Sequence, residues 1–356
     1  MDSRKKRFWK YFKKNKIALI GGGILVILYL SSIFAGLIAP YGVNNLRTDL
    51  CFHSLSKIHF YDIEKKAISF PFIYSTKLVT HKYQRKYQED YKQKVYLKFF
   101  TKGDSYKLLG FVPCNIHLFG VEEPYRIYLL GADRFGRDIF TRLLYGSQIS
   151  LSIGLVGISI TVTLGMIFGG LAGYYGGLVD TLLMRFCELL MSFPGLYLIM
   201  ALRATVPPTV PSTYMYLLTV VVLALVHWPG RARVIRGQVL SLREQEYVIA
   251  AKACGMSDIR IILRHILPNT FSYIIVSATL AIPGYILGET ILSYLNVGIQ
   301  EPQSSWGLML REAQNIAFWN QYPWILWPGF LIFITVLAFN FFGDGLRDAL
   351  DPKREK

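Results

Sequence analysis

A chain of 356 residues, of which 53% are hydrophobic and only 17% are charged, does not have the composition of a soluble protein of that length. Long uncharged apolar runs account for the excess, and they indicate a polytopic membrane protein. The net charge is +16, but no block of lysine and arginine alone resembles a nucleic-acid-binding arm, and the four cysteines lack CxxC spacing. We therefore expect no nucleic-acid partner, no metal site and no cofactor.

Six apolar runs are each near the ~20 residues that a helix needs to span a bilayer, the shorter ones by extending into their flanks. They cover residues 17–39, 151–173, 186–202, 214–228, 271–292 and 323–342. The first is too long for the core of a cleaved signal peptide, and no small-x-small cleavage site followed by a soluble chain appears after it. The sequence therefore predicts an all-α fold with six transmembrane helices.

The positive charges predict the orientation, because short loops rich in lysine and arginine stay in the cytoplasm. Eight of these residues lie in the first 16 positions, seven in residues 230–268 and four after Phe342. The two short loops on the other side carry only Arg203 and Arg311. Both termini and residues 230–268 are therefore expected in the cytoplasm, and residues 41–148 outside it.

The first boundary is expected after the basic N-terminus and first span, residues 1–40. Residues 41–128 differ in composition: positions 57–107 hold twelve Lys/Arg, five Asp/Glu and seven tyrosines. Their β-branched and aromatic content favours strands, above all in AISFPFIYSTKLVTH (67–81) and KVYLKFFTKG (94–103). We expect a small extracytoplasmic insert of mixed or β character, and a solvated basic loop is the alternative.

Two of the four cysteines, Cys51 and Cys114, fall in this outer insert. An extracytoplasmic disulfide and a pair of unpaired buried thiols both fit the sequence. The other two, Cys187 and Cys254, lie in the third apolar run and in the cytoplasmic segment.

Residues 129–148 contain glycines and a GRD turn, followed by an amphipathic run. Ile139, Leu143 and Leu144 are its apolar positions, and Arg137 and Arg142 are its polar ones. The pattern predicts a helix lying at the outer interface ahead of the second span.

The segment EYVIAAKACGMSDIRIILRHILPN (246–269) is largely polar, yet it lies between two apolar spans. Residues 243–254 are rich in helix formers, and Ala250, Ala251 and Ala253 leave a smooth surface that another protein can approach. Gly255 suits a helix C-terminus that needs positive φ. The sequence predicts a short helix that ends at this glycine.

A second short helix is expected to begin with Ser257 as its N-cap and to stop at Pro268. Its apolar stripe consists of Ile259, Ile262, Leu263 and Ile266. Two helices fixed at both ends to spans can transmit the movement of a soluble partner to the membrane. A plain amphipathic connector is the alternative.

Catalytic signatures are missing from the sequence. It contains no GxxxxGK[ST], so the chain is not expected to hydrolyse ATP, and it contains no HExxH or GxSxG. The triplet Gly21–Gly23 lies in a predicted span, where helix packing explains it.

Two acids lie within predicted spans and are candidates for function. Glu188 follows Arg185 by three positions, so both can share a helical face and pair, which favours a structural role. Glu289 has no obvious local partner in the sequence. It can serve either the pathway and its gating or a contact between helices.

Residues 230–269, GRARVIRGQVLSLREQEYVIAAKACGMSDIRIILRHILPN, resemble the cytoplasmic coupling loop of binding-protein-dependent ABC importer permeases. The family pattern is a Glu-Ala-Ala run, then a glycine, then Ile-Leu-Pro. Ile249 stands at the position of the family glutamate, and Glu246 is a nearby carboxylate. The resemblance implies an ATPase-docking role for Glu246, Ala250, Ala251, Gly255, Met256, Ser257, Ile266, Leu267 and Pro268.

Four further segments look like the C-type subunit of the dipeptide/oligopeptide (nickel) permeases. They are RFWKYFKKNKIALIGGGILV, LLGADRFGRDIFTRLLYGSQISL, GYYGGLVDTLLMRFCELLMSFP and AFNFFGDGLRDALDP. The resemblance covers residues 7–40 and 128–353. It implies a type I ABC importer permease fold, with a permease core at 149–344 and a cytoplasmic tail at 345–356.

The resemblance also implies function and partners. The chain would be a permease subunit in a bacterial inner membrane and would form half of a peptide pathway, in contact with membrane lipid. Its partners would be a second permease in a heterodimer, two cytoplasmic ATP-binding subunits and an extracytoplasmic substrate-binding protein. A nickel or small-solute permease of the same family is one alternative. An ion-coupled secondary transporter is another, and it would need inverted repeats and broken midplane helices.

Overall fold

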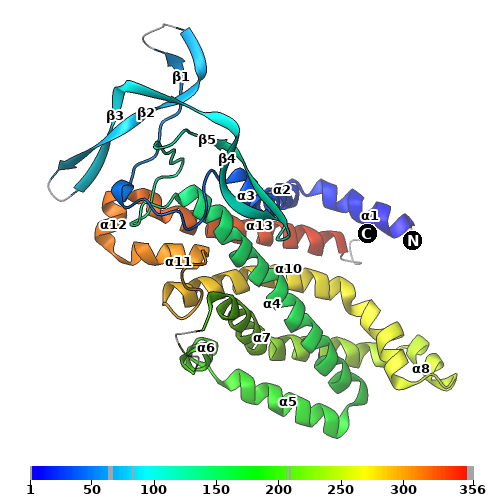
Figure 1. Ribbon diagram of the computed structural model, residues 1–356. Helices are drawn as coiled ribbons and strands as arrows, with labels where there is room; N and C mark the ends of the chain where they lie inside the picture. The colour runs from blue at the N-terminus through cyan, green and yellow to red at the C-terminus, as the bar shows by residue number, and fades with distance from the viewer. Residues whose placement is uncertain (1, 63–66, 82–83, 206, 208–209, 351–356) are drawn as a thin grey trace. The chain divides into compact units, whose positions relative to one another are not determined.

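The computed structural model describes residues 2–62, 67–81, 84–205, 207 and 210–350. These residues are mainly helical (Figure 1). The α-helices are α1 (Asp2–Lys14), α2 (Lys16–Ile33), α3 (Ala35–Ile38), α4 (Ile139–Tyr175), α5 (Gly177–Ser192), α6 (Gly195–Ala204), α7 (Ser212–Arg243), α8 (Glu246–Ala253), α9 (Asp258–Ile261), α10 (Leu267–Tyr294), α11 (Trp306–Leu310), α12 (Ile316–Gln321) and α13 (Trp327–Leu350). The single turns are the 3-10 segments η1 (Thr48–Leu50), η3 (Arg311–Gln314) and η4 (Pro323–Leu326) and the π-helical η2 (Ile262–Ile266).

The chain forms two compact units. The first comprises Met1–Leu25, Ser152–Leu292 and Ile334–Lys356, and the second comprises Val26–Leu151 and Ser293–Phe333. Helices α2, α4, α10 and α13 each continue from one unit into the other.

Among the described residues, five helical stretches are long and apolar enough to cross a membrane, and the pair α5 and α6 adds a sixth candidate if it counts as one span. The five are Lys16–Ile33, Ile139–Tyr175, Tyr214–Arg243, Asp258–Tyr294 and Pro323–Leu350. The predicted all-α polytopic fold is confirmed. The third predicted span, residues 186–202, is not one straight helix, because α5 and α6 meet at 81°. Phe193 takes an extended backbone there, as residues before a proline tend to do.

Helix α4 runs from Ile139 to Tyr175 without a break, so the predicted interfacial helix over residues 129–148 is not a separate element. Asp138 sets the start of α4. Its carboxylate accepts hydrogen bonds from the backbone N–H of Thr141 at 2.9 Å and from the Thr141 hydroxyl at 2.7 Å. The amphipathic turns therefore lead straight into the span.

In the first unit, a row of glycines on α4 faces α7. A side chain at Gly169 would collide with the carbonyl of Ala232, and one at Gly173 would lie 2.8 Å from the carbonyl of Arg236. Small residues at a spacing of four allow two helix backbones to approach closely inside a membrane. This close contact fixes α7 against α4.

Two glycines of the N-terminal triplet, Gly21 and Gly22, have the predicted packing role against α13, whereas a side chain on Gly23 would meet nothing within 4 Å. A side chain on Gly21 would lie 2.7 Å from the carbonyl of Ala338 in α13. Near the same helix pair, Phe12 of α1 stacks edge-on against Phe342 and belongs to a small apolar cluster with Ala18. These contacts hold α1 and α2 against α13.

The second unit contains the predicted β-structured insert. The strands are β1 (His59–Asp62), β2 (Ala67–His81), β3 (Gln84–Tyr96), β4 (Lys98–Leu108) and β5 (Val112–Gly120). They form an antiparallel sheet of order β1-β2-β3 and a separate hairpin of β4 and β5. A buried cluster of Ile73, Val95, Leu97 and Ile127 joins the sheet to the chain that follows it. The β prediction is therefore confirmed.

The two cysteines of the insert form no disulfide. Cys51 and Cys114 are both free and half-buried, and so they match neither a cross-link nor a fully buried pair. The Cys51 thiol instead lies 3.1 Å from the carbonyl of Thr48.

Candidate functional site

The segment between α7 and α10 is the first candidate site. Helix α8 ends as the sequence predicts, with Gly255 at φ +77°. The N–H of Met256 donates to the carbonyl of Ala251 at 3.2 Å, and the N–H of Gly255 donates to that of Lys252 at 3.0 Å. This pair of bonds is a Schellman motif, which closes the helix and reverses the chain.

The second predicted helix differs from the expectation at both ends. Ser257 occupies the N-cap position of α9, but its side chain makes no capping bond. Pro268 does not stop the helix, because α9, η2 and α10 run on as one apolar stretch from Asp258 to Tyr294. The π turn η2 ends at Ile266, two positions before the proline. A proline ring clashes with the carbonyl four residues earlier in a regular α-helix, and the wider π turn relieves that clash.

Burial divides the predicted docking residues into two sets. Ala251 is only 9% exposed and packs with Val248 against α7, so it lies beneath the surface and not on it as the sequence suggested. Ile266 and Leu267 are buried as well, and Met256 is half-buried against the same cluster. The exposed docking candidates are Glu246, Ala250, Gly255, Ser257 and Pro268.

The accessible face of α8 follows helical spacing. Glu246, Ile249, Ala250 and Ala253 stand at positions i, i+3, i+4 and i+7, and all four are exposed. Ile249 is 56% exposed at the position of the family glutamate. Glu246 lies one turn before it on the same face, so a carboxylate is present on this surface.

Polar contacts fix the element to neighbouring helices. The Tyr174 hydroxyl donates to the carboxylate of Asp258 at 2.7 Å, which joins α4 to α9. Arg243 donates to the carbonyl of Gly173 at 3.2 Å, at the end of α4. Arg236 of α7 forms a bidentate ion pair with Asp180 of α5. The α8–α9 segment is therefore one body with the adjoining ends of α4, α7 and α10.

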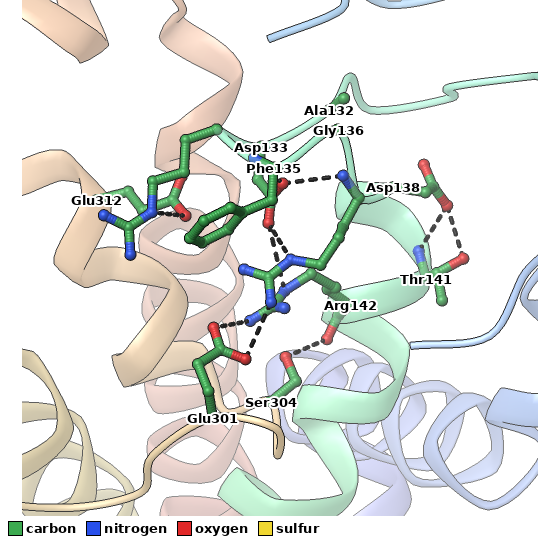
Figure 2. Close-up of polar contacts among 12 residues, drawn as sticks. Ala132, Asp133, Phe135, Gly136, Asp138, Thr141, Arg142, Glu301, Ser304 and Glu312 are labelled. Carbon is green, nitrogen blue, oxygen red and sulfur yellow. Dashed lines mark hydrogen bonds and ion pairs between the residues drawn. The ribbon is translucent and has the colours of Figure 1, made fainter. Parts of the chain in front are cut away.

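The GADRFGRD loop of the second unit is the second candidate site (Figure 2). One Asp133 carboxylate oxygen accepts the backbone N–H of Phe135 at 2.8 Å and that of Arg137 at 2.9 Å. The other accepts Arg137 Nε at 2.6 Å. Gly136 has φ +72°, and a side chain there would collide with the carbonyl of Arg47. The loop is thus wrapped around one carboxylate.

Glu301, from the loop after α10, joins this network. It accepts Arg137 Nη1 at 2.9 Å and Arg142 Nη2 at 3.3 Å. The two arginines are 5% and 2% exposed, so these polar positions of the amphipathic run are buried within the unit. Burial raises the pKa of Glu301, but the Arg142 and Arg137 guanidinium groups outweigh it and hold this pKa below its usual range.

Glu312 of η3 lies at the edge of the same network. Burial, and next the Asp133 charge, raise its pKa to about 7, although Arg134 lies 3.5 Å away. Glu312 and Arg142 both line a cavity of about 10 Å³, and Arg142 Nε and Nη1 have no hydrogen-bond partner among the described residues. That volume suits one water molecule.

Sequence reasoning missed Glu301 and Glu312. Both lie about 160 or more positions from the arginines they meet, and no local spacing signals such a contact. The only local signal was the GRD turn itself.

The two intramembrane acids differ in setting. Glu188 pairs with Arg185 at 2.8 Å, as predicted, and is partly exposed. Glu289 is fully buried in α10. Burial inside one chain favours a role in helix contacts over a role on an open pathway wall.

A polytopic helical membrane protein, with a short two-helix segment between α7 and α10, is the class of protein that these features define. Residues 165–356 match the family described as "Binding-protein-dependent transport system inner membrane component", and residues 3–52 match the "N-terminal TM domain of oligopeptide transport permease C". The first match spans more than half of the chain, so the chain belongs to that family of ABC transport permeases.

Several curated relatives are similar over most of their length. The oligopeptide transport system permease protein OppC of Haemophilus influenzae is 44% identical over 64% of this chain and 70% of its own. The dipeptide transport system permease protein DppC of Bacillus subtilis is 42% identical, over 63% and 68%. The glutathione transport system permease protein GsiD of Pectobacterium atrosepticum is 40% identical, over 65% and 75%.

Solved structures are more distant. The inward-facing MetNI methionine ABC transporter gives a TM-score of 0.47 at 16% identity and covers 59% of this chain and 96% of that one. An amino acid ABC transporter with histidines gives 0.41 at 15% identity, over 55% and 87%.

Proposed function

We propose that this chain is the permease subunit of an ATP-driven importer of di- or oligopeptides. The similarity to OppC and DppC supports peptides as the substrate class. The chain would form half of the pathway in a heterodimer with a second permease. Two cytoplasmic ATP-binding subunits would hydrolyse the ATP, since this sequence has no phosphate-binding loop, and an extracytoplasmic protein would deliver the peptide.

Both termini and the α8–α9 element would face the cytoplasm, and the β-structured insert would face outward. The basic N-terminus, with eight Lys/Arg in 16 positions, supports this orientation. The proposed segments are residues 1–40, 41–128 and 129–148, a core at 149–344 and a tail at 345–356. Helix α4 crosses the boundary between residues 148 and 149.

The observation that carries the proposal is the exposed small-residue face of α8 on a body fixed to three transmembrane helices. Ala250 and Ala253 let a partner approach closely. The Schellman turn at Gly255 and the hydrogen bond from Tyr174 to Asp258 would transmit a displacement of α8 to the transmembrane helices.

A bulky side chain on the exposed face should block docking. We expect Ala250→Trp to leave the chain inserted at normal abundance, to remove co-purifying ATPase and to abolish ATP-driven peptide uptake. Gly255→Val should act in the same way, because a β-branched residue at φ +77° is strained by roughly 1–2 kcal/mol even though space for its Cβ is open. Ala251→Trp is a poor test, because Ala251 is buried and overpacking alone would disturb the element.

Lys252→Trp is the matched control, because Lys252 is exposed on the flank of α8 and not on the face of Ala250. Retention of ATPase by both Ala250→Trp and Gly255→Val, at the level of Lys252→Trp, would show that the segment is only a connector.

A further inference from the structure

A pocket of about 260 Å³ lies between α7 and α10 in the first unit. It is lined by His227, Gly230, Arg231, Ala281, Gly284 and Tyr285. The pocket is smaller than the roughly 300–1,000 Å³ of whole-ligand sites, so it suits part of a ligand.

The same dipeptide occurs on both walls. Pro229-Gly230 lies inside α7 and Pro283-Gly284 lies inside α10, and both helices continue past the dipeptide. A proline in a helix interior removes one backbone hydrogen bond and bends the helix away from it. A Cβ on Gly230 or Gly284 would meet nothing within 4 Å. On both helices, the glycine therefore leaves backbone atoms uncovered where it lines the pocket.

The polar groups of the pocket are arranged as a donor and an acceptor. His227 Nδ1 lies 2.7 Å from the carbonyl of Leu223 and must donate to it, because a carbonyl only accepts. This bond leaves Nε2 of the neutral ring as an acceptor. The ring also packs 5.1 Å from that of Tyr285, whose hydroxyl bonds to Thr161 of α4.

Arg231 supplies the donor. Its Cβ lies against Gly165 of α4, a contact that only a small residue allows, and its side chain is half-exposed. In the described part of the chain, Arg231 makes no ion pair with a carboxylate. Arg231 lies inside Tyr214–Arg243, a stretch long and apolar enough to cross a membrane that extends past the span predicted at residues 214–228. A guanidinium and an imidazole within such a stretch cost several kcal/mol against hydrocarbon, so this face meets water or ligand and not lipid tails.

We infer that this pocket binds the C-terminal carboxylate of the peptide in transit, with Arg231 holding the carboxylate and His227 Nε2 accepting the neighbouring peptide N–H. The inference rests on the proposed peptide transport. A guanidinium matches a carboxylate with two parallel hydrogen bonds. Every linear peptide ends in this group whatever its side chains, so one arginine serves a carrier of many sequences.

The first test uses the assembled importer in vesicles, with alanyl-alanine as the probe. Arg231→Gln should lower uptake at least 10-fold while ATPase and second permease still co-purify, and Arg231→Lys should restore part of it. Arg233→Gln is the matched control, because Arg233 lies two positions away and 3.8 Å from Glu188. Uptake by Arg231→Gln within twofold of the control would overturn the inference. Loss of the partner subunits in Arg231→Gln would overturn it too, because Arg231 would then serve assembly.

The second test measures the pocket directly. Gly284→Cys should react with an anionic water-soluble methanethiosulfonate several-fold faster than with a cationic one, as detected by mass spectrometry of residue 284. Alanyl-alanine should slow the reaction, and Arg231→Gln should remove the charge preference. Leu225→Cys, on an exposed position of α7 outside the pocket lining, is the control and should react little. An unreactive Gly284→Cys, or rates indifferent to both peptide and Arg231, contradicts the assignment.

The two proposals fail differently. If the importer with the natural chain takes up no peptide, the proposed substrate class is wrong. If natural uptake is normal and the pocket variants behave like their controls, only the carboxylate site is wrong.

Discussion

Asp133 shows how one carboxylate can specify a loop. Its two oxygens accept two backbone N–H groups and one guanidinium, and the positive φ of Gly136 allows the chain to close around them. One buried side chain thus satisfies three donors of the loop and fixes the path of its backbone.

Glu312 gives this network a pH dependence of known sign. Its pKa is raised in the folded chain, so the folded state binds the proton more tightly than the unfolded state. The associated stability is fully present below the ordinary glutamate pKa of about 4.5 and is lost as the pH rises to about 7. We expect Glu312→Gln, which mimics the protonated form, to melt near the natural chain at pH 5 and above it at pH 8.

Thermal melting of the purified chain in detergent at the two pH values measures this difference. Asp133, Arg134, Arg137 and Arg142 face Glu312 and stay unchanged in the variant. A stabilisation no larger at pH 8 than at pH 5 would contradict the assignment.

Glu289 is the second residue whose setting leads to a prediction. It is fully buried in α10, where a truncated side chain leaves its neighbours without a partner. We expect Glu289→Ala to destabilise the chain by about 1–3 kcal/mol and to lower the yield of assembled complex, and Glu289→Gln to do so much less. Melting and complex yield are the measurements, and the exposed Glu188→Ala is the control. Equal melting of Glu289→Ala and Glu188→Ala would remove any structural role for the buried acid.

At the scale of elements, local signals in the sequence were reliable where the cause is local. Gly255 ends α8 because positive φ suits glycine, and β2 forms where β-branched and aromatic residues gather. Pro268 misled the prediction, because a π turn relieves a clash that is unavoidable in a regular helix. The burial of Ala251 was equally invisible, since it depends on α7 and α10 and not on the residues beside it.

The three-stranded sheet β1–β3 of the insert can be removed along structural boundaries. Ile58 and Leu97 both pack in the cluster around Ile127, so a short Gly-Ser linker in place of residues 59–96 can join the chain ends without cutting the β4–β5 hairpin. We expect this change to leave assembly with the ATPase intact and to lower peptide uptake and binding-protein association several-fold, because exposed tyrosines such as Tyr61 and Tyr91 suit a protein interface.

Uptake and co-purification of the binding protein measure the effect. A matched variant would replace Tyr61 and Tyr91 by serine and keep the sheet. If the deletion variant and the serine variant both take up peptide and retain the binding protein as the natural chain does, the sheet has no role in transport.

At the scale of the whole molecule, composition alone predicted a polytopic membrane protein, and the permease family was predicted from the resemblance of particular motifs. The bilayer requires long apolar runs in the spans and favours Lys and Arg in the loops on one side. Both patterns can be recognised in the sequence without a structure. The ion network around Asp133 and the pocket beside Arg231 depend on residues brought together from distant parts of the sequence. Composition therefore predicts the spans but not the side-chain contacts that form the two candidate sites.

The exposed Ile249 on α8 has a consequence for how the subunit is made. More than half of this side chain meets solvent in the isolated chain, on a surface that is otherwise small or charged. Water solvates such a side chain poorly, so an ATPase covering it would gain roughly 1.5–3 kcal/mol of association free energy at most. On the proposed docking, a copy synthesised without that partner would leave this apolar side chain uncovered, and we expect its lifetime in the cell to shorten when the ATPase is scarce.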